Sequence, residues 1–161
     1  MALDKKQLQK NYQLGVEIFE CPKIETWNSR REWLDKELEY AQTGLSYLVS
    51  DHSTALFMDM QLAFCAGAWI SVIVMSISVI DSHFRETESG DNSIGTAKLL
   101  QDFYKGEEID WLRKLRNRYV HHNLEKPLLD TNAWFSQTRL EKDAYKAMKM
   151  TIAALFQNPG I

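Results

Sequence analysis

The stretch LAFCAGAWISVIVMSISVI, residues 62–80, decides the fold, because its 19 residues include no charged side chain. A helix of that length can cross a bilayer. However, Asp59 and Asp81 flank the stretch, and no cluster of Lys or Arg adjoins either end. A helix that is apolar on all sides can also form the buried centre of a bundle. We therefore expect one long central helix over about 53–86, with a membrane span as the alternative.

The segments around this stretch carry the spacing of amphipathic helices. The clearest places apolar residues at steps of three or four, at Leu34, Leu38, Ala41, Leu45 and Leu48. Ser29 and Glu32 have the spacing of a capping box, so we expect a helix over about 29–50. Further helices are expected over about 4–19, 94–104, 107–123 and 136–157.

The composition agrees with an all-α protein. The chain has 161 residues, 45% of them hydrophobic, with only seven Gly and three Pro. This apolar content excludes a disordered chain, and the scarcity of Gly and Pro argues against a turn-rich all-β fold. We expect residues 1–161 to form a single up-and-down bundle of about five to six helices.

Charge and cysteine content define the expected environment. The net charge of −3 means that any nucleic-acid site must be a local basic patch. Cys21 and Cys65 lie far apart and form no CxxC or metal-ligand spacing, so we expect no disulfide framework. The N-terminus, MALDKKQLQKNYQ, lacks the apolar region of a signal peptide. We therefore expect a reduced, cytoplasmic protein.

One segment, WLRKLRNRYVHHN at residues 111–123, has the residue types of a chemical site. It contains four cations followed by two histidines, namely Arg113, Lys114, Arg116, Arg118, His121 and His122. On a helix, Arg113, Asn117 and His121 lie one turn apart on a common face. Arginine binds phosphate through paired hydrogen bonds, and histidine transfers protons near neutral pH. These residue types suit phosphodiester cleavage, although a basic helix face of this kind is usually only a solvated surface.

The sequence Arg116-Asn117-x-x-x-His121 resembles the Arg-Asn-x-x-x-His signature of the HEPN superfamily, whose members are all-α bundles of this size. Chain length, helix order and the position of the motif extend the resemblance over about residues 30–156. It implies a homodimeric endoribonuclease that uses no metal and no cofactor, as in toxin–antitoxin and antiphage systems. An antitoxin or another defence protein is then an expected partner, and no membrane is involved.

The resemblance also implies a role for each motif residue. His121 is expected to transfer protons while a ribose 2′-hydroxyl attacks the neighbouring phosphate, and Arg116 to stabilise charge on the phosphate oxygens. Asn117 is expected to orient the motif, and the products would carry a 2′,3′-cyclic phosphate and a 5′-hydroxyl. The family often has a small residue after the histidine, whereas this chain has His122. Both histidines are therefore candidates, and we favour His121 because Asn117 lies one turn before it.

Several other residues are expected to support the site. By the same resemblance, Asp81 on the neighbouring helix would orient His121 or Arg116, with an ordinary surface position as the alternative. His52 is expected in an exposed loop. The candidate supporting or RNA-binding residues on the motif helix are Arg113, Arg118, Tyr119 and His122.

A different class of function is the alternative. A non-catalytic HEPN-like module would bind RNA, a nucleotide or a partner protein, and the acidic net charge supports this hypothesis. In a third interpretation the motif only packs a dimer. We expect no metal site and no Gly-rich phosphate loop, because the required spacings are missing from the sequence. A catalyst needs Arg116 and His121 exposed in one cleft, which separates the first hypothesis from the second.

Overall fold

The structure, a computed structural model, describes residues 21–121, 123–125 and 133–159. The helix expected over 4–19 and His122 lie outside the described residues. Within those residues every named element is helical, and the only β-type pairing is an isolated bridge between Tyr47 and Pro159. The prediction of an all-α bundle is confirmed.

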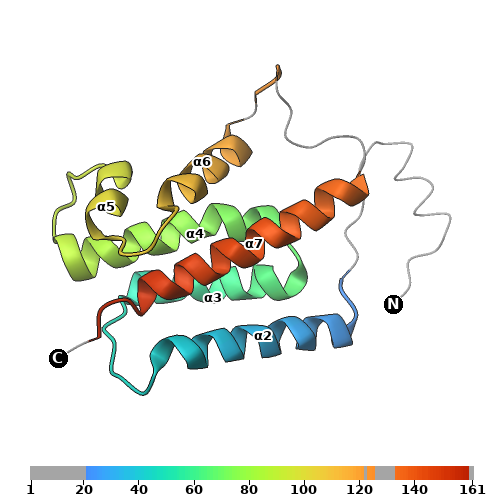
Figure 1. The fold of residues 1–161 in the computed structure, drawn as a ribbon, viewed down its shortest axis with the longest axis horizontal. Helices are drawn as coiled ribbons and strands as arrows, with labels where there is room; N and C mark the ends of the chain where they lie inside the picture. The colour runs from blue at the N-terminus through green and yellow to red at the C-terminus, as the bar shows by residue number, and fades with distance from the viewer. Residues whose placement is uncertain (1–20, 122, 126–132, 160–161) are drawn as a thin grey trace.

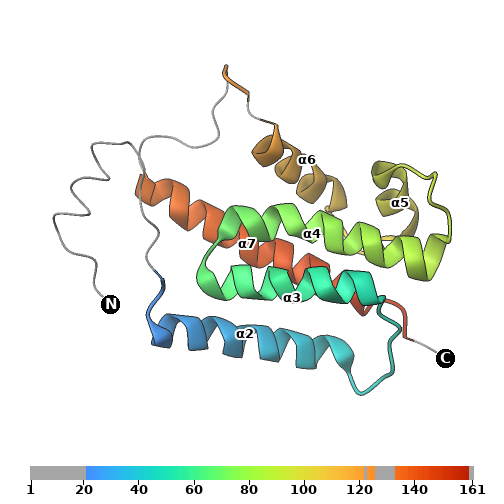
Figure 2. The same cartoon turned by 180° about the vertical axis from the view of Figure 1, so that it is seen from behind.

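Four long helices lie side by side around the core (Figures 1 and 2). They are α2 (Ile24–Gln42), α3 (Asp51–Ala66), α4 (Trp69–Phe84) and α7 (Ala133–Leu155). The first three alternate in direction, and α7 runs in the same direction as α4. Between α4 and α7 the chain forms three shorter elements, η1 (Arg85–Ser89, a π-helical turn), α5 (Thr96–Phe103) and α6 (Ile109–Val120). Both α5 and α6 lie on the side of α4 that faces away from α2.

The apolar stretch forms two helices, which corrects the expectation of one helix over 53–86. Helix α3 ends at Ala66, and Gly67 adopts the left-handed conformation with φ of 81°. The N–H groups of Gly67 and Ala68 donate to the carbonyls of Phe64 at 3.1 Å and Ala63 at 2.9 Å. This is the pattern with which glycine closes a helix end. The chain then reverses, so that α4 packs back along α3.

The Arg30 side chain of α2 holds this reversal in place. Its Nη1 donates to the Cys65 carbonyl at 3.0 Å, and its guanidinium lies 4.5 Å from the centre of the Trp69 ring. A Cβ atom at Gly67 would lie only 2.9 Å from that Nη1. The backbone conformation favours glycine, and a side chain here would also displace the Arg30 guanidinium. Divided in this way, the stretch leaves no described helix with the length and apolarity needed to cross a bilayer.

Helix α4 is the buried centre that the apolar stretch predicts. Five of its apolar side chains have no exposed surface, namely Val72, Ile73, Val79, Ile80 and Phe84. Helices α3 and α7 pack along α4, and α5 and α6 cover its remaining side. Burial on nearly every side explains why this helix lacks a polar face.

The first half of the apolar stripe predicted for α2 is confirmed, but the second half lies beyond the end of the helix. Leu34 is buried, but the helix ends at Gln42, where Thr43 and Gly44 both adopt positive φ. Leu45 and Leu48 follow this end and are 55% and 71% exposed. The helix begins at Ile24, so the predicted capping box lies inside it. The three helices expected over 94–104, 107–123 and 136–157 match α5, α6 and α7 to within a few residues.

Candidate functional site

The basic segment forms α6, and packing decides which of its polar side chains reach solvent. Leu112 and Leu115 are 0% and 1% exposed and attach α6 to α4. Among the polar residues, the half-buried ones are Arg113, Arg116 and Asn117, and the exposed ones are Lys114, Arg118 and His121. The half-buried group lies where α6 leaves the core, at the edge of a cavity.

That cavity has a volume of about 610 Å³ and opens between α3, α4, α5 and α6. We call it the arginine cavity. Its lining consists of His52, Leu56, Ile77, Ser78, Asp81, Ser82, Arg85, Thr96, Ala97, Arg113, Arg116 and Asn117. The volume falls within the range of small-molecule sites, about 300–1,000 Å³. The structure thus brings four predicted site residues into one cavity: Arg113, Arg116, Asn117 and Asp81.

Arg116 enters the cavity without a carboxylate partner among the described residues. Its Nη1 donates to Oδ1 of Asn117 at 3.0 Å, so the neighbouring amide holds the guanidinium. Its Nε is buried and has no hydrogen-bond partner in the described part of the chain. An unpaired buried donor costs about 1–3 kcal/mol.

The positive charge of Arg113 is only weakly neutralised by a neighbouring carboxylate. Its Nε and Nη2 both lie 3.4 Å from the same oxygen of Asp110, one turn earlier on α6. The Asp110 side chain is 50% exposed and does not line the cavity. A long contact to an exposed carboxylate contributes little, so Arg113 keeps most of its capacity to bind an anion.

Asp81 lines the arginine cavity, and among the described residues it forms an ion pair with Arg85. The two carboxylate oxygens accept from Nε and Nη2 of Arg85 at 2.8 and 3.0 Å, and both side chains are about one-fifth exposed. This paired hydrogen bond raises the pKa of Arg85. Asp81 therefore cancels the charge of Arg85, and the other two arginines keep theirs.

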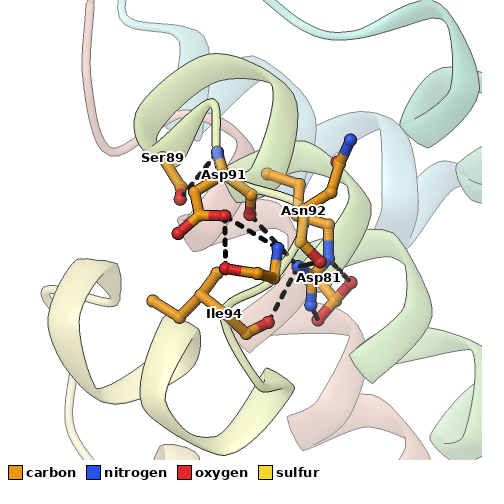
Figure 3. Close-up of polar contacts among 7 residues, drawn as sticks. Asp81, Ser89, Asp91, Asn92 and Ile94 are labelled. Carbon is orange, nitrogen blue, oxygen red and sulfur yellow. Dashed lines mark hydrogen bonds and ion pairs between the residues drawn. The ribbon is translucent and has the colours of Figure 1, made fainter.

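Arg85 also holds the loop that leads into α5, and Figure 3 labels Asp91, Asn92 and Ile94 of this loop beside Asp81. Its Nη1 donates to the backbone carbonyl of Ile94 at 2.9 Å, and the carbonyls of Asp91 and Asn92 lie 3.4 Å away. Asp91 in turn accepts two hydrogen bonds of 2.7 Å from Ser93, which lower the pKa of the Asp91 carboxyl. The first turn of α5, which lines the cavity, is thus held by a network that joins Asp81 of α4, Arg85 of η1 and the loop before α5.

His121 lies outside the arginine cavity. It caps the C-terminal end of α6, where its N–H donates to the Asn117 carbonyl at 2.8 Å, and it is exposed. Within one copy of the described chain, Arg116 and His121 therefore do not share this cavity. His122 is not among the described residues, so the choice between the two histidines stays a prediction.

The remaining candidates on α6 occupy different surroundings. Arg118 lines a more open hollow of about 650 Å³ together with Trp111, Lys114 and Asn117. Tyr119 is half-buried against the core, and burial raises the pKa of its hydroxyl. Tyr119 lines neither the hollow nor the arginine cavity.

His52 is the main residue of the cavity that sequence reasoning missed. It is exposed as expected, but it lies in the first turn of α3 rather than in a loop, and it lines the arginine cavity. Ser50 caps this helix by accepting from the Ser53 N–H at 3.0 Å. The spacing of Ser50 and Ser53 is a sequence signal for that helix start. No local signal places His52 beside α6, because only the tertiary fold brings the two together.

Comparisons of the chain with protein-family models, curated proteins and solved structures found no match. Among the described residues, no group of three or more His, Cys, Asp or Glu side chains is placed to hold a metal ion.

Proposed function

We propose that this protein is a metal-independent endoribonuclease of the HEPN type that cuts single-stranded or looped RNA as a homodimer. The observation that carries the proposal is the arrangement of α6. Arg116, which lacks a carboxylate partner in the described chain, and Asn117 border an open cavity, and His121 follows one turn later at the exposed end of the helix. Cation, amide and imidazole are the groups that RNA cleavage needs, and one rigid helix carries all three.

Two copies of α6 are needed to complete the site, because Arg116 and His121 of one copy do not share the arginine cavity. In the proposed dimer the motif ends of the two helices meet. One imidazole accepts the proton of the ribose 2′-hydroxyl as its oxygen attacks phosphorus. The other imidazole donates a proton to the departing 5′-oxygen. Arg116 stabilises the charge on the phosphate oxygens, and the products are a 2′,3′-cyclic phosphate and a 5′-hydroxyl.

The biological setting is part of the same proposal. A nuclease of this kind would act as a toxin or an antiphage-defence component, restrained by an antitoxin or another defence protein. Since the chain carries a net charge of −3, RNA must bind through the local cations of α6. Binding that depends on a few phosphate contacts weakens only moderately as salt rises.

A cleavage assay in EDTA with bulk RNA and tRNA tests the proposal. Wild type is compared with Arg116→Ala, His121→Ala and His52→Ala, and with Arg31→Ala as a matched loss of an exposed arginine on α2. We expect Arg116→Ala and His121→Ala to slow cleavage by about 10²–10⁴-fold, and Arg31→Ala to cleave like wild type. Cleavage that survives His121→Ala but stops in His52→Ala would overturn the role given to His121.

A second candidate is a non-catalytic module that binds RNA, a nucleotide or a partner protein. One observation favours it: the histidine that lines the arginine cavity with Arg116 is His52, and His121 lies outside. A folded, dimeric wild type that binds RNA but never cleaves it would support this candidate over the nuclease.

A further inference from the structure

We infer that the arginine cavity is a subsite for one nucleotide unit of the RNA strand, next to the phosphate that is cut. This inference rests on the proposed function, because it assigns a part of the substrate to a specific part of the protein. The argument uses the charge, the size and the rigidity of the cavity.

The cavity has an excess of positive charge in a protein of net charge −3. Among its lining residues the single carboxylate is Asp81, and Arg85 engages both of its oxygens. Arg113 and Arg116 remain, one facing an exposed carboxylate at 3.4 Å and the other an amide. Because Arg116 is assigned to the phosphate that is cut, Arg113 is the guanidinium left for the phosphate diester of the neighbouring nucleotide.

The cavity is too large for a phosphate alone, and the rest of its lining is too apolar. Leu56, Ile77 and Ala97, from three different helices, supply aliphatic surface. The total volume of about 610 Å³ leaves room for a sugar and a base beside the phosphate. Hydroxyl groups of Ser78 and Thr96 are available to the sugar. The combination fits one nucleotide unit better than a bare anion.

The wall formed by α5 is fixed before any ligand arrives. Arg85 binds the Ile94 carbonyl, directly before Gly95, the N-cap of α5. Gly95 provides no side-chain cap, so the first N–H groups of α5, at Thr96 and Ala97, have no partner within the helix. These residues line the same cavity as the two arginines. A preformed wall lowers the entropic cost of binding.

The place of the cavity along α6 relates it to the cut phosphate. Asn117 lines the cavity, and His121 follows four residues later as the C-cap of α6, about 6 Å further along the axis. A strand whose reacting phosphate lies between Arg116 and His121 can continue along α6 to Arg113 in the cavity. The nucleotide in the cavity is the neighbour of the one that is cut.

Two substitutions test the subsite without touching the proposed catalytic residues. Ala97→Leu, at an exposed position of α5, fills the cavity, and Arg113→Ala removes a phosphate contact. The matched controls are Ala153→Leu on the exposed face of α7 and Arg31→Ala on α2. All four are made in the His121→Ala chain, so that the RNA stays intact while binding is measured. Circular dichroism confirms that each variant is folded.

The measurement is fluorescence anisotropy with a labelled single-stranded oligoribonucleotide over a series of salt concentrations. We expect Ala97→Leu and Arg113→Ala to weaken binding about tenfold or more, and the controls to bind like the parent. Arg113→Ala should also reduce the slope of log Kd against log salt by about 0.7, which a purely structural defect would not do. Affinity and salt slope that are unchanged in both variants would overturn the inference.

Competition with a free nucleoside monophosphate tests whether the cavity binds a nucleotide of the RNA strand or a free nucleotide at a separate site. Displacement of the RNA by the mononucleotide, lost in Ala97→Leu, supports the subsite. Binding of the mononucleotide at the cavity without any competition would show a separate nucleotide site and overturn the assignment to RNA. Because these readouts measure binding, they decide the inference even if wild type shows no cleavage, a result that would overturn only the proposed function.

Discussion

At the residue scale, three half-buried side chains of α6 show what sequence can and cannot predict. The spacing of Arg113 and Asn117 places them on one helix face, and both line the arginine cavity as that spacing suggests. His52 and Arg85 join them from α3 and η1, and no local pattern predicts this, because tertiary packing sets the distance. The sequence therefore predicted that Arg113 and Asn117 share a helix face, but it did not predict the cavity that they line or the position of His121 outside it.

The burial of His83 leads to a prediction about how the stability of the protein depends on pH. It is 3% exposed, and its Nδ1 has no partner among the described residues. Burial lowers the pKa of His83 below its ordinary value of 6.5, although Glu88 and Glu86 oppose this shift. Below pH 6.5 the unfolded chain thus binds more protons than the folded one, and the free energy of unfolding falls as pH falls.

We expect His83→Leu to remove the part of this acid sensitivity that begins near pH 6.5. The substitution keeps the site apolar and leaves no unpaired nitrogen, so stability at pH 7.5 should change by less than about 1.5 kcal/mol. Urea denaturation of wild type and variant at pH 7.5 and pH 5 measures both effects. An equal loss of stability in the two proteins at pH 5 would show that His83 is not the group responsible.

At the element scale, the division of the apolar stretch into α3 and α4 depends on Gly67. The absence of charge over residues 62–80 predicted a buried helix, and α4 is buried, but a uniformly apolar run contains no polar face that would reveal a reversal. Gly67 was the available signal, since glycine favours the left-handed conformation that ends a helix. The end of α2 at Gln42 was missed for a similar reason, because Leu45 and Leu48 continue the helical spacing beyond it.

Gly67→Ala should destabilise the protein more than Gly90→Ala does. Both glycines have positive φ, at 81° and 62°, so alanine costs about 1–2 kcal/mol at each. At Gly67 alone, the added Cβ also meets Arg30, whereas nothing lies within 4 Å of it at Gly90. Thermal or urea unfolding measures the difference.

A double-mutant cycle separates the two causes of the destabilisation, which are the backbone strain at positive φ and the contact with Arg30. In an Arg30→Ala background the penalty of Gly67→Ala should fall to that of Gly90→Ala, because the contact with the guanidinium is gone. A penalty that stays the same in both backgrounds would assign the whole effect to backbone strain.

Arg85→Gln should loosen α5 while the four-helix core stays folded. The substitution removes the paired bond to Asp81 and the contact to the Ile94 carbonyl, and these hold the loop before α5. We expect amide hydrogen exchange to speed up in α5 and to stay unchanged in the centre of α4. Asn92→Ala is a suitable control, because Arg85 contacts only the backbone of residue 92.

At the scale of the whole molecule, the proposed dimer determines whether the site is complete. Val120 and Leu124, on either side of His121, are 44% and 86% exposed. Single exposed apolar residues are common, but these two adjoin the residue that the proposal places at the contact between copies. The sequence motif could indicate such a contact only by resemblance, because one chain does not reveal its oligomeric state.

Val120→Glu should therefore convert a dimer into a monomer. A charge at the contact between two copies would face its own symmetry mate, and like charges repel. Light scattering coupled to size-exclusion chromatography measures the mass, and Met58→Glu, at a 61% exposed position of α3, is the control. A Val120→Glu protein that stays dimeric would show that the copies meet elsewhere.

The central position of α4 also has a consequence for biosynthesis. Helix α7, which covers α4, is synthesised after all the other described helices, and 48 residues separate Phe84 from Ala133. At the usual speed of translation, about 5–20 residues per second, one apolar side of α4 stays uncovered for several seconds on every ribosome. During this interval the nascent chain displays the surface that chaperones recognise. A chain that terminates before α7 would expose that surface permanently, so we expect it to aggregate or be degraded.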